Sequence, residues 1–333
     1  MSSATRVTIH RSQFPEAVRH DLLESLRTRR VNHKFHYDSI KQTQKWLALH
    51  QVYSPTRNDA DCRAIYEKSF EAAAAKIKTK NVHVIGLGCG GGQNDTRLLK
   101  MLRQRGKKVF YTPCDVSMAM VLTARRTALA VVPEKDCFPF VCDLATADDL
   151  REALVTRHPS LVTFFGMIPN FEPGRILPKL AALVRPNDFL LFSANLAPGK
   201  NYATGVKKVL PQYDNPLTRN WLLTWLLDLG VRRRDGTLIF DIETDSISGL
   251  KRIVAGFHFT RSRRIEVETK AFSFRAGQII RLFFSYRYTP ERVVAVLARH
   301  GLTVCRQWIA KSGEEGVFLC NRRSRREETH SSS

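Results

Sequence analysis

A run of glycines between a predicted strand and a predicted helix is the part of this 333-residue chain whose residue types best suit ligand binding. Glycine at such a turn lets the backbone approach a bound molecule with no side chain in the way. A tight strand-to-helix turn without a ligand would need similar glycines, so the run alone is a weak motif. We take Gly86, Gly88 and Gly90 as candidate binding positions within the run Gly86-Leu87-Gly88-Cys89-Gly90-Gly91-Gly92.

Two aspartates follow the next two predicted strands. Asp115 lies 25 residues beyond Gly90, where a carboxylate can accept hydrogen bonds from a pair of ribose hydroxyls. Asp143 could accept a hydrogen bond from an exocyclic amino group, with Leu144 as an apolar neighbour for an adenine ring. Each aspartate could instead cap the helix that follows it. The glycine run and both aspartates together resemble the S-adenosylmethionine site of class I methyltransferases.

The glycine run lacks the features that bind phosphate. The chain has no Gly-x-x-x-x-Gly-Lys-Ser/Thr sequence, and its glycine spacing departs from the Gly-x-Gly-x-x-Gly pattern of dinucleotide sites. These absences agree with S-adenosylmethionine, which carries no phosphate. Many methyltransferases have an acidic residue two positions before the first glycine of this motif, where this chain has Gly86. We therefore expect the methionine end of the cofactor to be held differently.

Short apolar runs separated by amphipathic segments must position these residues. Strands that are apolar on both faces and alternate with helices favour a parallel sheet with right-handed crossovers. The predicted fold is therefore α/β and doubly wound, and the resemblance of the glycine run and the two aspartates implies a class I (Rossmann-like) S-adenosylmethionine-dependent methyltransferase core. The predicted strands of this core span residues 82–87, 109–114, 138–142, 161–165 and 189–193.

The segments on either side of this core have a different character. Residues 1–57 are rich in helix formers and basic residues, with Pro15 near a helix start. Residues 202–230 are predicted to be helical, and residues 289–300 form a later helix. Further strands are predicted at residues 237–245, 251–259, 265–274, 279–288, 304–309 and 316–320.

This pattern predicts two structural units. Residues 58–195 and 288–321 are expected to form the methyltransferase core, which the last two strands complete. Residues 1–57 are expected to form a helical unit, and residues 196–287 an inserted α+β subdomain. The charged and small residues of 322–333 predict a disordered tail.

Several short motifs, by their order and spacing along the chain, carry a resemblance to a known family that covers residues 31 to 321. They are Phe35-His36-Tyr37-Asp38-Ser39, Tyr53-Ser54-Pro55-Thr56-Arg57, Gly88-Cys89-Gly90 with Thr96-Arg97-Leu98-Leu99, Asp115-Val116-Ser117, Asp143, Asn170-Phe171-Glu172-Pro173, and Tyr213-Asp214 with Asn220. They resemble the histidine-specific, S-adenosylmethionine-dependent methyltransferases. That family includes enzymes that trimethylate the histidine α-amine in ergothioneine biosynthesis, and fungal enzymes that methylate dimethylallyltryptophan.

The resemblance implies an enzyme that uses S-adenosylmethionine to methylate an amine, and it implies roles for three residues. It also implies that residues 1–57 and 196–287 together form an α+β substrate-binding domain inserted into the methyltransferase core. In the family, the asparagine of the Asn-Phe-Glu-Pro motif and the tyrosine of the Tyr-Asp motif hold the amine and carboxylate of an amino acid. By similarity these catalytic residues are Asn170 and Tyr213, and Tyr37 would line the same pocket. Without the resemblance, either tyrosine would be interpreted as a half-buried packing residue.

Two departures from the family pattern concern the acceptor. The family tyrosine just before Pro-Thr-Arg is replaced by Ser54, and the glutamate that recognises imidazole is replaced by Phe283 in the register that aligns Ser285. A buried imidazole N–H without a partner costs about 1–3 kcal/mol. We therefore expect a small amine or amino acid other than histidine, such as an aromatic amino acid or an alkylated amine. Phe283 and Phe284 could equally be core residues of a strand.

The formal charge of +22 keeps an alternative function open. A surplus of lysine and arginine suits a phosphate-rich partner, so an RNA or DNA methyltransferase is the main rival hypothesis. The charge is spread along the chain, however, and no Asn/Asp-Pro-Pro-Tyr/Phe motif for base methylation is present. The departures at Gly86, Ser54 and Phe283 allow a third hypothesis, a noncatalytic protein that binds S-adenosylmethionine.

Composition also argues against several classes of protein. The seven cysteines are odd in number and form no Cys-x-x-Cys pair, so neither a disulfide framework nor a metal site is expected. No run of 18 apolar residues and no secretory signal is present, so we expect a cytoplasmic protein without a membrane span. The sequence does not indicate an oligomeric state.

Overall fold

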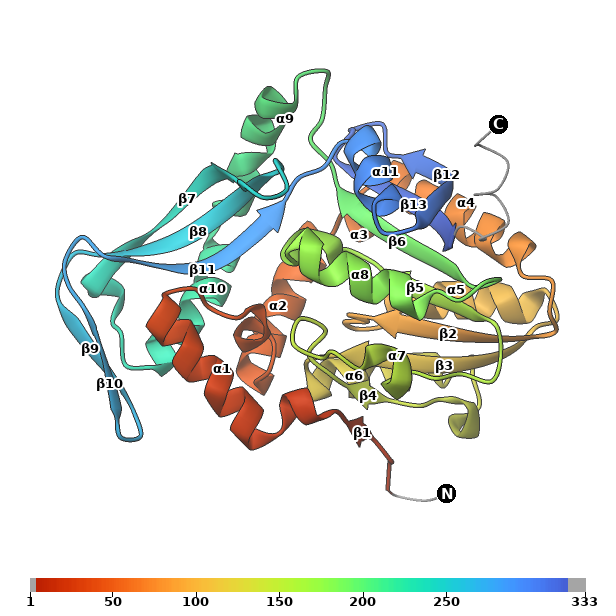
Figure 1. Ribbon diagram of the computed structural model, residues 1–333, viewed down its shortest axis with the longest axis horizontal. Coiled ribbons are helices and arrows are strands. Elements are labelled where there is room, and N and C mark those ends of the chain that lie inside the picture. The colour runs from red at the N-terminus through yellow and green to blue at the C-terminus, as the bar shows by residue number, and fades with distance from the viewer. Residues whose placement is uncertain (1–3, 323–333) are drawn as a thin grey trace, which may run out of the picture.

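The computed structural model describes residues 4–322, and its largest feature is an eight-stranded mixed sheet (Figure 1). Its strand order is β1-β4-β3-β2-β5-β6-β13-β12. β13 runs antiparallel to both of its neighbours, whereas the other pairs are parallel. The strands are β1 (Thr8–Ile9), β2 (Asn81–Leu87), β3 (Lys108–Asp115), β4 (Phe140–Val141), β5 (Ser160–Phe164), β6 (Phe189–Asn195), β12 (Leu302–Ile309) and β13 (Glu315–Arg322).

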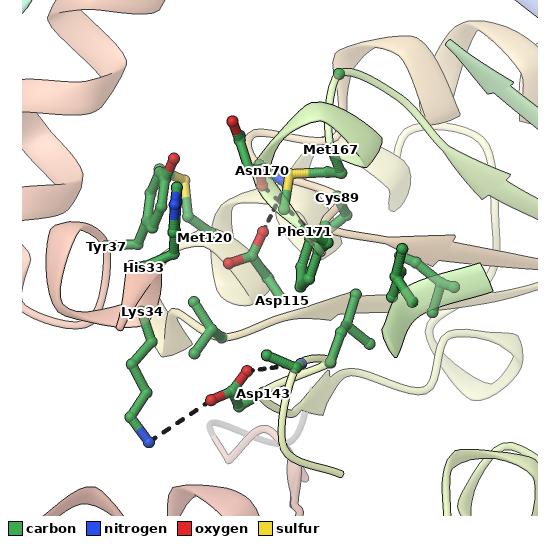
Figure 2. Close-up of a pocket in the computed structure, with 18 of the residues that line it drawn as sticks. His33, Lys34, Tyr37, Cys89, Asp115, Met120, Asp143, Met167, Asn170 and Phe171 are labelled. Atoms are coloured by element: carbon green, nitrogen blue, oxygen red, sulfur yellow. Dashed lines mark hydrogen bonds and ion pairs between the residues drawn. The ribbon is translucent and has the colours of Figure 1, made fainter. Parts of the chain in front are cut away.

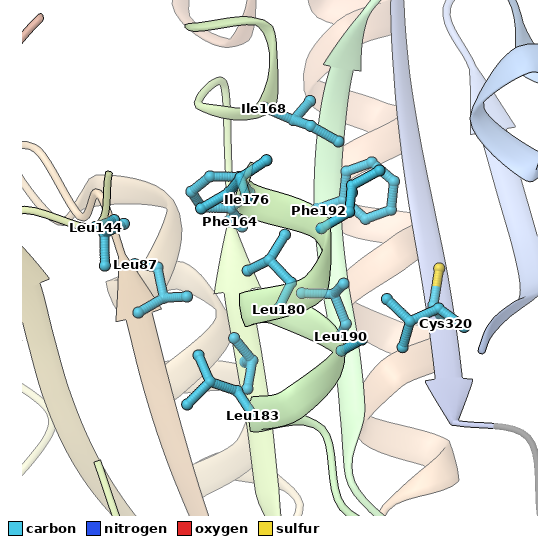
Figure 3. Close-up of a cluster of buried hydrophobic side chains, with 14 of the residues drawn as sticks. Leu87, Leu144, Phe164, Ile168, Ile176, Leu180, Leu183, Leu190, Phe192 and Cys320 are labelled. Carbon is cyan, nitrogen blue, oxygen red and sulfur yellow. The ribbon is translucent and has the colours of Figure 1, made fainter. Parts of the chain in front are cut away.

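Helices cover both faces of this sheet and bury its apolar side chains. Figure 3 shows part of one interface, where Ile176 and Leu180 of α8 lie over Phe164, Leu190 and Phe192 of β5 and β6. The strand order and the two helical layers confirm the predicted α/β, Rossmann-like fold of class I. The helices are α4 (Ala60–Lys76), α5 (Gln93–Gln104) and α6 (Met118–Ala128) on one face, and α7 (Leu150–Ala153), α8 (Pro173–Leu183) and α11 (Pro290–Ala298) on the other.

The N-terminal helices and the segment between β6 and α11 lie together beside this sheet, at the left of Figure 1. They share a hydrophobic core that includes Leu26, Phe35, Trp221 and Phe257. A three-stranded antiparallel sheet in the order β11-β8-β7 forms one side of it. The elements are α1 (Pro15–Thr28), α2 (Ile40–Tyr53), α3 (Pro55–Asn58), α9 (Tyr202–Val209), α10 (Pro216–Asp228), β7 (Gly236–Thr244), β8 (Lys251–Phe259), the hairpin β9 (Arg263–Val267) and β10 (Lys270–Phe274), and β11 (Ile279–Tyr286).

Some elements differ from the sequence-based expectation. The strand predicted at 265–274 is a hairpin, because the chain reverses at Glu268 with a φ of +52°. β1 was not predicted, and it pairs with β4 at the edge of the core sheet. Residue 322 belongs to β13 and not to a disordered tail, and the remainder of that predicted tail lies outside the described residues.

Gly92 is a turn residue on which the packing of α5 against α6 depends. It lies immediately before α5 with a φ of +74°, in the left-handed region that favours glycine. An added Cβ would lie 2.7 Å from the Cα of Ala124 in α6. Backbone atoms cannot rotate out of the way, so both the conformation and the contact favour glycine.

We expect Gly92→Ala to destabilise the protein more than its control, Gly230→Ala. Gly230 has a φ of +85°, but no atom lies within 4 Å of an added Cβ there. The left-handed conformation costs alanine about 1–2 kcal/mol at either position, and overpacking costs about 1–3 kcal/mol more at Gly92 alone. Urea unfolding measures both losses. Equal losses in the free energy of unfolding of the two variants would show that α6 shifts to accommodate the methyl group at position 92.

Candidate active site

The carboxyl ends of β2, β3 and β4 open into a cavity of about 490 Å³, here called cavity A (Figure 2). Residues 30–34 of the N-terminal segment and the loop after β5 complete its wall. The carboxyl ends of parallel strands meet at one edge of a sheet, which is why distant parts of the sequence converge here. Five of the six residues expected to bind the cofactor line cavity A, namely Gly88, Gly90, Asp115, Asp143 and Leu144.

Asp115 ties the glycine turn to the end of β3. One carboxylate oxygen accepts a hydrogen bond from the N–H of Gly90, and the other from the N–H of Ser117, both at 3.0 Å. Burial raises the pKa of Asp115, and these N–H groups oppose the shift. Ser117 caps α6, so Asp115 does not cap that helix. It presents a fixed carboxylate to cavity A.

Asp143 is held by residues from the N-terminal segment (Figure 2). Its Oδ2 lies 3.7 Å from the Nζ of Lys34, a fully buried ammonium group that also contacts Asp21. The backbone N–H of Asp143 donates to the Oγ of Ser12 at 3.0 Å. Its Oδ1 accepts from the N–H of Ala145 at 2.9 Å, so Asp143 closes a turn and does not cap a helix.

The structure corrects the expectation for Gly86, which lies within β2 and lines neither cavity A nor the second cavity described below. An added Cβ on Gly86 would lie 2.1 Å from the Oδ2 of Asp95 in α5. Asp95 lines cavity A and accepts hydrogen bonds from Tyr111 at 2.7 Å and Thr163 at 2.8 Å. Burial raises its pKa to about 6. A carboxylate therefore lies beside Gly86, although it comes from the following helix.

A second cavity of about 680 Å³, here called cavity B, lies between the core sheet and the inserted elements. Parts of α2, α4, α10, β11 and the turn before β13 form its wall. The structure thus brings together segments from both ends and the middle of the chain. The residues expected to recognise the acceptor all line this cavity, namely Tyr37, Ser54, Asn170, Tyr213, Phe283 and Ser285.

Cavities A and B share part of their walls. Tyr37 packs against the rings of Trp46 and Trp221. Burial raises the pKa of its phenol, and the nearby charge of Asp115 raises it further, so Tyr37 remains protonated. Asn170 lies in the short helix η4 (Ile168–Asn170) after β5. The two cavities therefore adjoin at a shared wall, which consists of Tyr37, Trp46, His50, Asn94, Phe165, Gly166 and Asn170.

Another part of the cavity B wall combines aromatic rings with hydroxyl groups. The ring of Phe283 lies 5.9 Å from that of Trp221 and 6.1 Å from that of Tyr213, measured between centroids. The hydroxyl of Tyr213 donates to the Oγ of Ser285 at 2.9 Å and accepts from Arg287 at 2.7 Å. Phe283 therefore offers this cavity an apolar ring and no hydrogen-bond acceptor.

Glu315 is a buried carboxyl group in the wall of cavity B. The hydroxyl of Tyr66 donates a hydrogen bond to it at 2.7 Å. Burial raises the pKa of Glu315 to about 7, and the opposing effects of Tyr66, Ser193 and Arg287 offset only part of that shift. Glu315 therefore exchanges a proton near neutral pH.

Several residues in these walls were not predicted from the sequence. Asp95 could have been found, because the motif lacks its usual acidic residue at Gly86 and Asp95 is an acidic residue in the first turn of the next helix, α5. Arg287 could also have been found. Side chains two positions apart on a strand share a face, and Arg287 continues the series of Phe283 and Ser285. The others carry no signal in a single sequence, and they include His33, Trp46, Asn94 and Met167.

Two further observations concern metal ions and membranes. Within residues 4–322, no group of three or more histidine, cysteine or acidic side chains is placed to hold a metal ion. Over the same residues, no helix combines the length and apolar character that crossing a membrane requires.

Comparisons with known proteins identify similar sequences and folds. A family model described as histidine-specific methyltransferase, SAM-dependent, matches residues 18–322. The histidine N-alpha-methyltransferase of Mycobacterium tuberculosis is 29% identical over 308 residues, which cover 86% of this chain and 88% of that protein. A S-adenosylmethionine-dependent methyltransferase from Clostridium acetobutylicum has 13% identity and a TM-score of 0.47, covering 84% of this chain and 99% of its own. Magnesium protoporphyrin IX methyltransferase from Synechocystis, solved with bound SAH, has 14% identity and a TM-score of 0.46, covering 86% and 97%.

We expect the stability of the protein to fall, relative to Glu315→Gln, as the pH rises from about 5 to 8. The folded protein holds the Glu315 proton up to a pKa of about 7, above the ordinary value of 4.5. The folded state therefore binds more protons than the unfolded state in this range, so the contribution of this group to stability decreases with pH. Urea unfolding of both proteins at several pH values measures the difference. A constant difference would contradict the burial argument.

Proposed function

Because this chain belongs to the family of histidine-specific, S-adenosylmethionine-dependent methyltransferases, we propose that it methylates the nitrogen of a small amine or amino acid other than histidine. Its dependence on S-adenosylmethionine and its membership of the one-carbon transferases follow from the family. The acceptor is the new part of this proposal, and the wall of cavity B supports it.

Phe283 is the observation that carries the proposed acceptor. It stands in the wall of cavity B at the position where the family has a glutamate that recognises imidazole. A phenylalanine cannot accept the imidazole N–H, and an unpaired buried donor costs about 1–3 kcal/mol. The adjacent rings of Trp221 and Tyr213 make this region aromatic. An aromatic amino acid or an alkylated amine suits such a surface better than histidine does.

We assign S-adenosylmethionine to cavity A, whose residues suit its chemistry. Asp115 would bind the ribose hydroxyls, and Asp143 would accept a hydrogen bond from the adenine amino group beside Leu144. Gly88 and Gly90 would let the backbone approach the cofactor. When bound, the cofactor supplies a methyl group on a positively charged sulfur. The carboxylates of cavity A provide a favourable field for that charge.

Asp95 would hold the methionine end of the cofactor. It is 3% exposed, lines cavity A and takes the place of the acidic residue that the motif lacks at Gly86. The hydroxyls of Tyr111 and Thr163 fix its orientation but leave further acceptor sites on each oxygen. An ammonium group can therefore donate to the same carboxylate.

Asn170 and Tyr213 would orient the acceptor amine. Asn170 lies in the wall shared by both cavities, and Tyr213 lies in the wall of cavity B. Holding two reactants in the right geometry lowers a barrier by about 7–11 kcal/mol, so positioning is the main task of these residues. The amine must lose its proton before it attacks, and in our proposal water takes that proton.

We propose that the N-terminal helices and residues 196–287 act as the substrate-binding domain. Their shared core includes Phe35 and Trp221, of which Trp221 also lines cavity B, and β11 supplies Phe283 and Ser285 to the same wall. Residues 58–195 and 288–321 would then bind the cofactor. With this division, the acceptor site would lie between the substrate-binding domain and the core.

The proposal is tested by mass spectrometry of a reaction that contains the purified protein, S-adenosylmethionine, amino acids, biogenic amines and short RNA. We expect one small amine to gain one or more methyl groups. Histidine is expected to be a poor acceptor or none. Methylation confined to RNA, or of histidine in preference to every other amine, would overturn the proposal.

On the acceptor found, Asn170→Ala and Tyr213→Phe are each expected to lower kcat/KM by about 10-fold or more, since each loses a contact worth about 1.4 kcal/mol. Affinity for S-adenosylhomocysteine, measured by calorimetry, is the control for folding and should stay within about 2-fold. Unchanged turnover in both variants would remove the assigned roles.

Asp95→Asn is expected to weaken the binding of S-adenosylhomocysteine by about 10-fold, equivalent to about 1.4 kcal/mol. The reason is the loss of a charged partner for the ammonium group of the ligand. 5′-Methylthioadenosine lacks that ammonium group and is the matched control, so its affinity should not change. Equal weakening of both ligands by calorimetry would show that Asp95 only supports the fold.

A further inference from the structure

Glu315 is a buried acid in cavity B to which the proposed function gives no role. It is the first residue of β13, lines the cavity and is 8% exposed. It lies opposite Asn195, the last residue of β6, in the register of the core sheet. β6 is parallel to β5, so both strands end at the carboxyl edge of that sheet. Glu315 therefore brings a carboxyl group to the same edge of the sheet into which cavity A opens.

Hydroxyl groups connect Glu315 to the wall that the two cavities share. The hydroxyl of Tyr66 donates to Oε1 of Glu315 at 2.7 Å, and Ser193 of β6 also hydrogen-bonds to this carboxyl group. The Oγ of Ser193 accepts a hydrogen bond from the backbone N–H of Gly166 at 2.8 Å. Gly166 lies in the shared wall, in the same loop as Asn170. Glu315 is therefore held in place, and Ser193 links it to the shared wall where the amine and the methyl group would meet.

The charged and titratable groups near Glu315 leave its protonation state balanced. Tyr66 and Cys62 of α4 remain protonated, because burial raises the pKa of each. The charge of Arg287, which follows β11, favours the ionised form of Glu315, whereas burial favours the protonated form and has the larger effect. Glu314 is the adjacent acid of the same strand region and also lines cavity B. Glu315 can therefore both accept and release a proton near neutral pH.

Other basic groups in the walls of cavity B are less suited to take a proton from an amine. Asp59 accepts two backbone N–H groups at the start of α4. Glu314 is less buried than Glu315 and accepts a hydrogen bond from Gln212 at 2.9 Å. His50 lies in the shared wall, but burial lowers its pKa to about 4. The ordinary pKa of an α-amino group is about 8, so the pKa of about 7 at Glu315 is the closer match.

We propose that Glu315 is the final acceptor of the proton that the amine loses before methyl transfer. This role rests on the proposed function and goes beyond it, because there water alone takes the proton. An N–H bond of the ammonium group breaks, and the proton passes through water to the carboxylate of Glu315. The lone pair left on nitrogen forms the new N–C bond, while the S–C bond breaks and its electron pair stays on sulfur. Glu315 then returns the proton to solvent, so each methyl transfer releases one proton.

The first test compares kcat/KM of the wild type and Glu315→Gln from pH 7 to pH 9.5 on the amine that the protein methylates. A positioned base contributes about 10²–10⁴-fold, so Glu315→Gln should be slower by about 100-fold at pH 7. A free amine needs no base. For an amine with a pKa of about 8, the free fraction rises about 10-fold over this range, so the deficit should shrink by about that factor. A structural defect would instead keep the ratio of the two proteins constant with pH.

Glu314→Gln is the matched control, because it removes the adjacent acid of the same cavity. Its kcat/KM should follow that of the wild type at every pH. S-adenosylhomocysteine affinity shows whether each variant is folded. Glu315→Asp keeps a carboxyl group, should retain part of the activity at pH 7, and covers the case in which Glu315→Gln does not fold. A ratio of wild type to Glu315→Gln that stays constant with pH, or equal rates at pH 7, would overturn the role of Glu315.

The second test needs no turnover and measures the protons released when the same amine binds to the S-adenosylhomocysteine complex. An ammonium group near Glu315 favours the carboxylate, so binding should expel the proton that Glu315 holds. At pH 7 the wild type should release about half a proton more than Glu315→Gln, measured by calorimetry in buffers of different ionisation enthalpy. Equal release would overturn the role of Glu315.

Failure of this role and failure of the proposed function give different results. Methylation of an amine with the same pH profile in the wild type and Glu315→Gln would support the proposed function and overturn only the role of Glu315. If no amine is methylated, the proposed function fails, and the role of Glu315 fails with it.

Discussion

The buried ammonium group of Lys34 is the constraint on which the structure around cavity A depends. It is fully buried and contacts Asp21 of α1 and Asp143 of the loop that follows β4. A buried charge that loses one partner destabilises a protein by about 3–5 kcal/mol. The N-terminal helices must therefore stay in place over the carboxyl edge of the sheet. β4 has only two residues, and Asp143 lies just beyond it in a loop.

Other contacts of the N-terminal segment serve the same purpose. β1 extends the sheet beside β4, and Ser12 accepts a hydrogen bond from the backbone of Asp143. His10 contacts Asp149 at 2.8 Å further along the same loop. From the opposite side, Lys179 of α8 donates to three carbonyl oxygens in residues 144–147. A loop without regular structure thus holds its aspartate through contacts with two distant segments.

The sequence predicted features that depend on local pattern and missed those that depend on packing between distant segments. Apolar runs and a glycine turn identify strands and their carboxyl ends, so Asp115 and Asp143 could be placed at one edge of the sheet. The close approach of Asp95 in α5 to Gly86 in β2 depends on how the helix packs against the strand, so the sequence can suggest Asp95 as an acidic residue but cannot show this contact. The burial of Glu315 in the wall of cavity B is also invisible in the sequence, because it depends on the packing of β13 against α4, whose Tyr66 donates a hydrogen bond to it.

The same short N-terminal segment also holds the strand that forms the wall of cavity B. The N–H of Val31 donates to the carbonyl oxygen of Arg281, and the N–H of Arg281 donates to that of Arg29, both at 2.9 Å. A ring nitrogen of His36 lies 2.7 Å from the carbonyl oxygen of Leu282. These bonds fix the register of β11 just before the residues that line the cavity. Residues 29–36 therefore contact the walls of both cavity A and cavity B, where we propose that the cofactor and the acceptor bind. Since methyl transfer requires both molecules to be aligned, a shared rigid segment is a direct physical way to set that alignment.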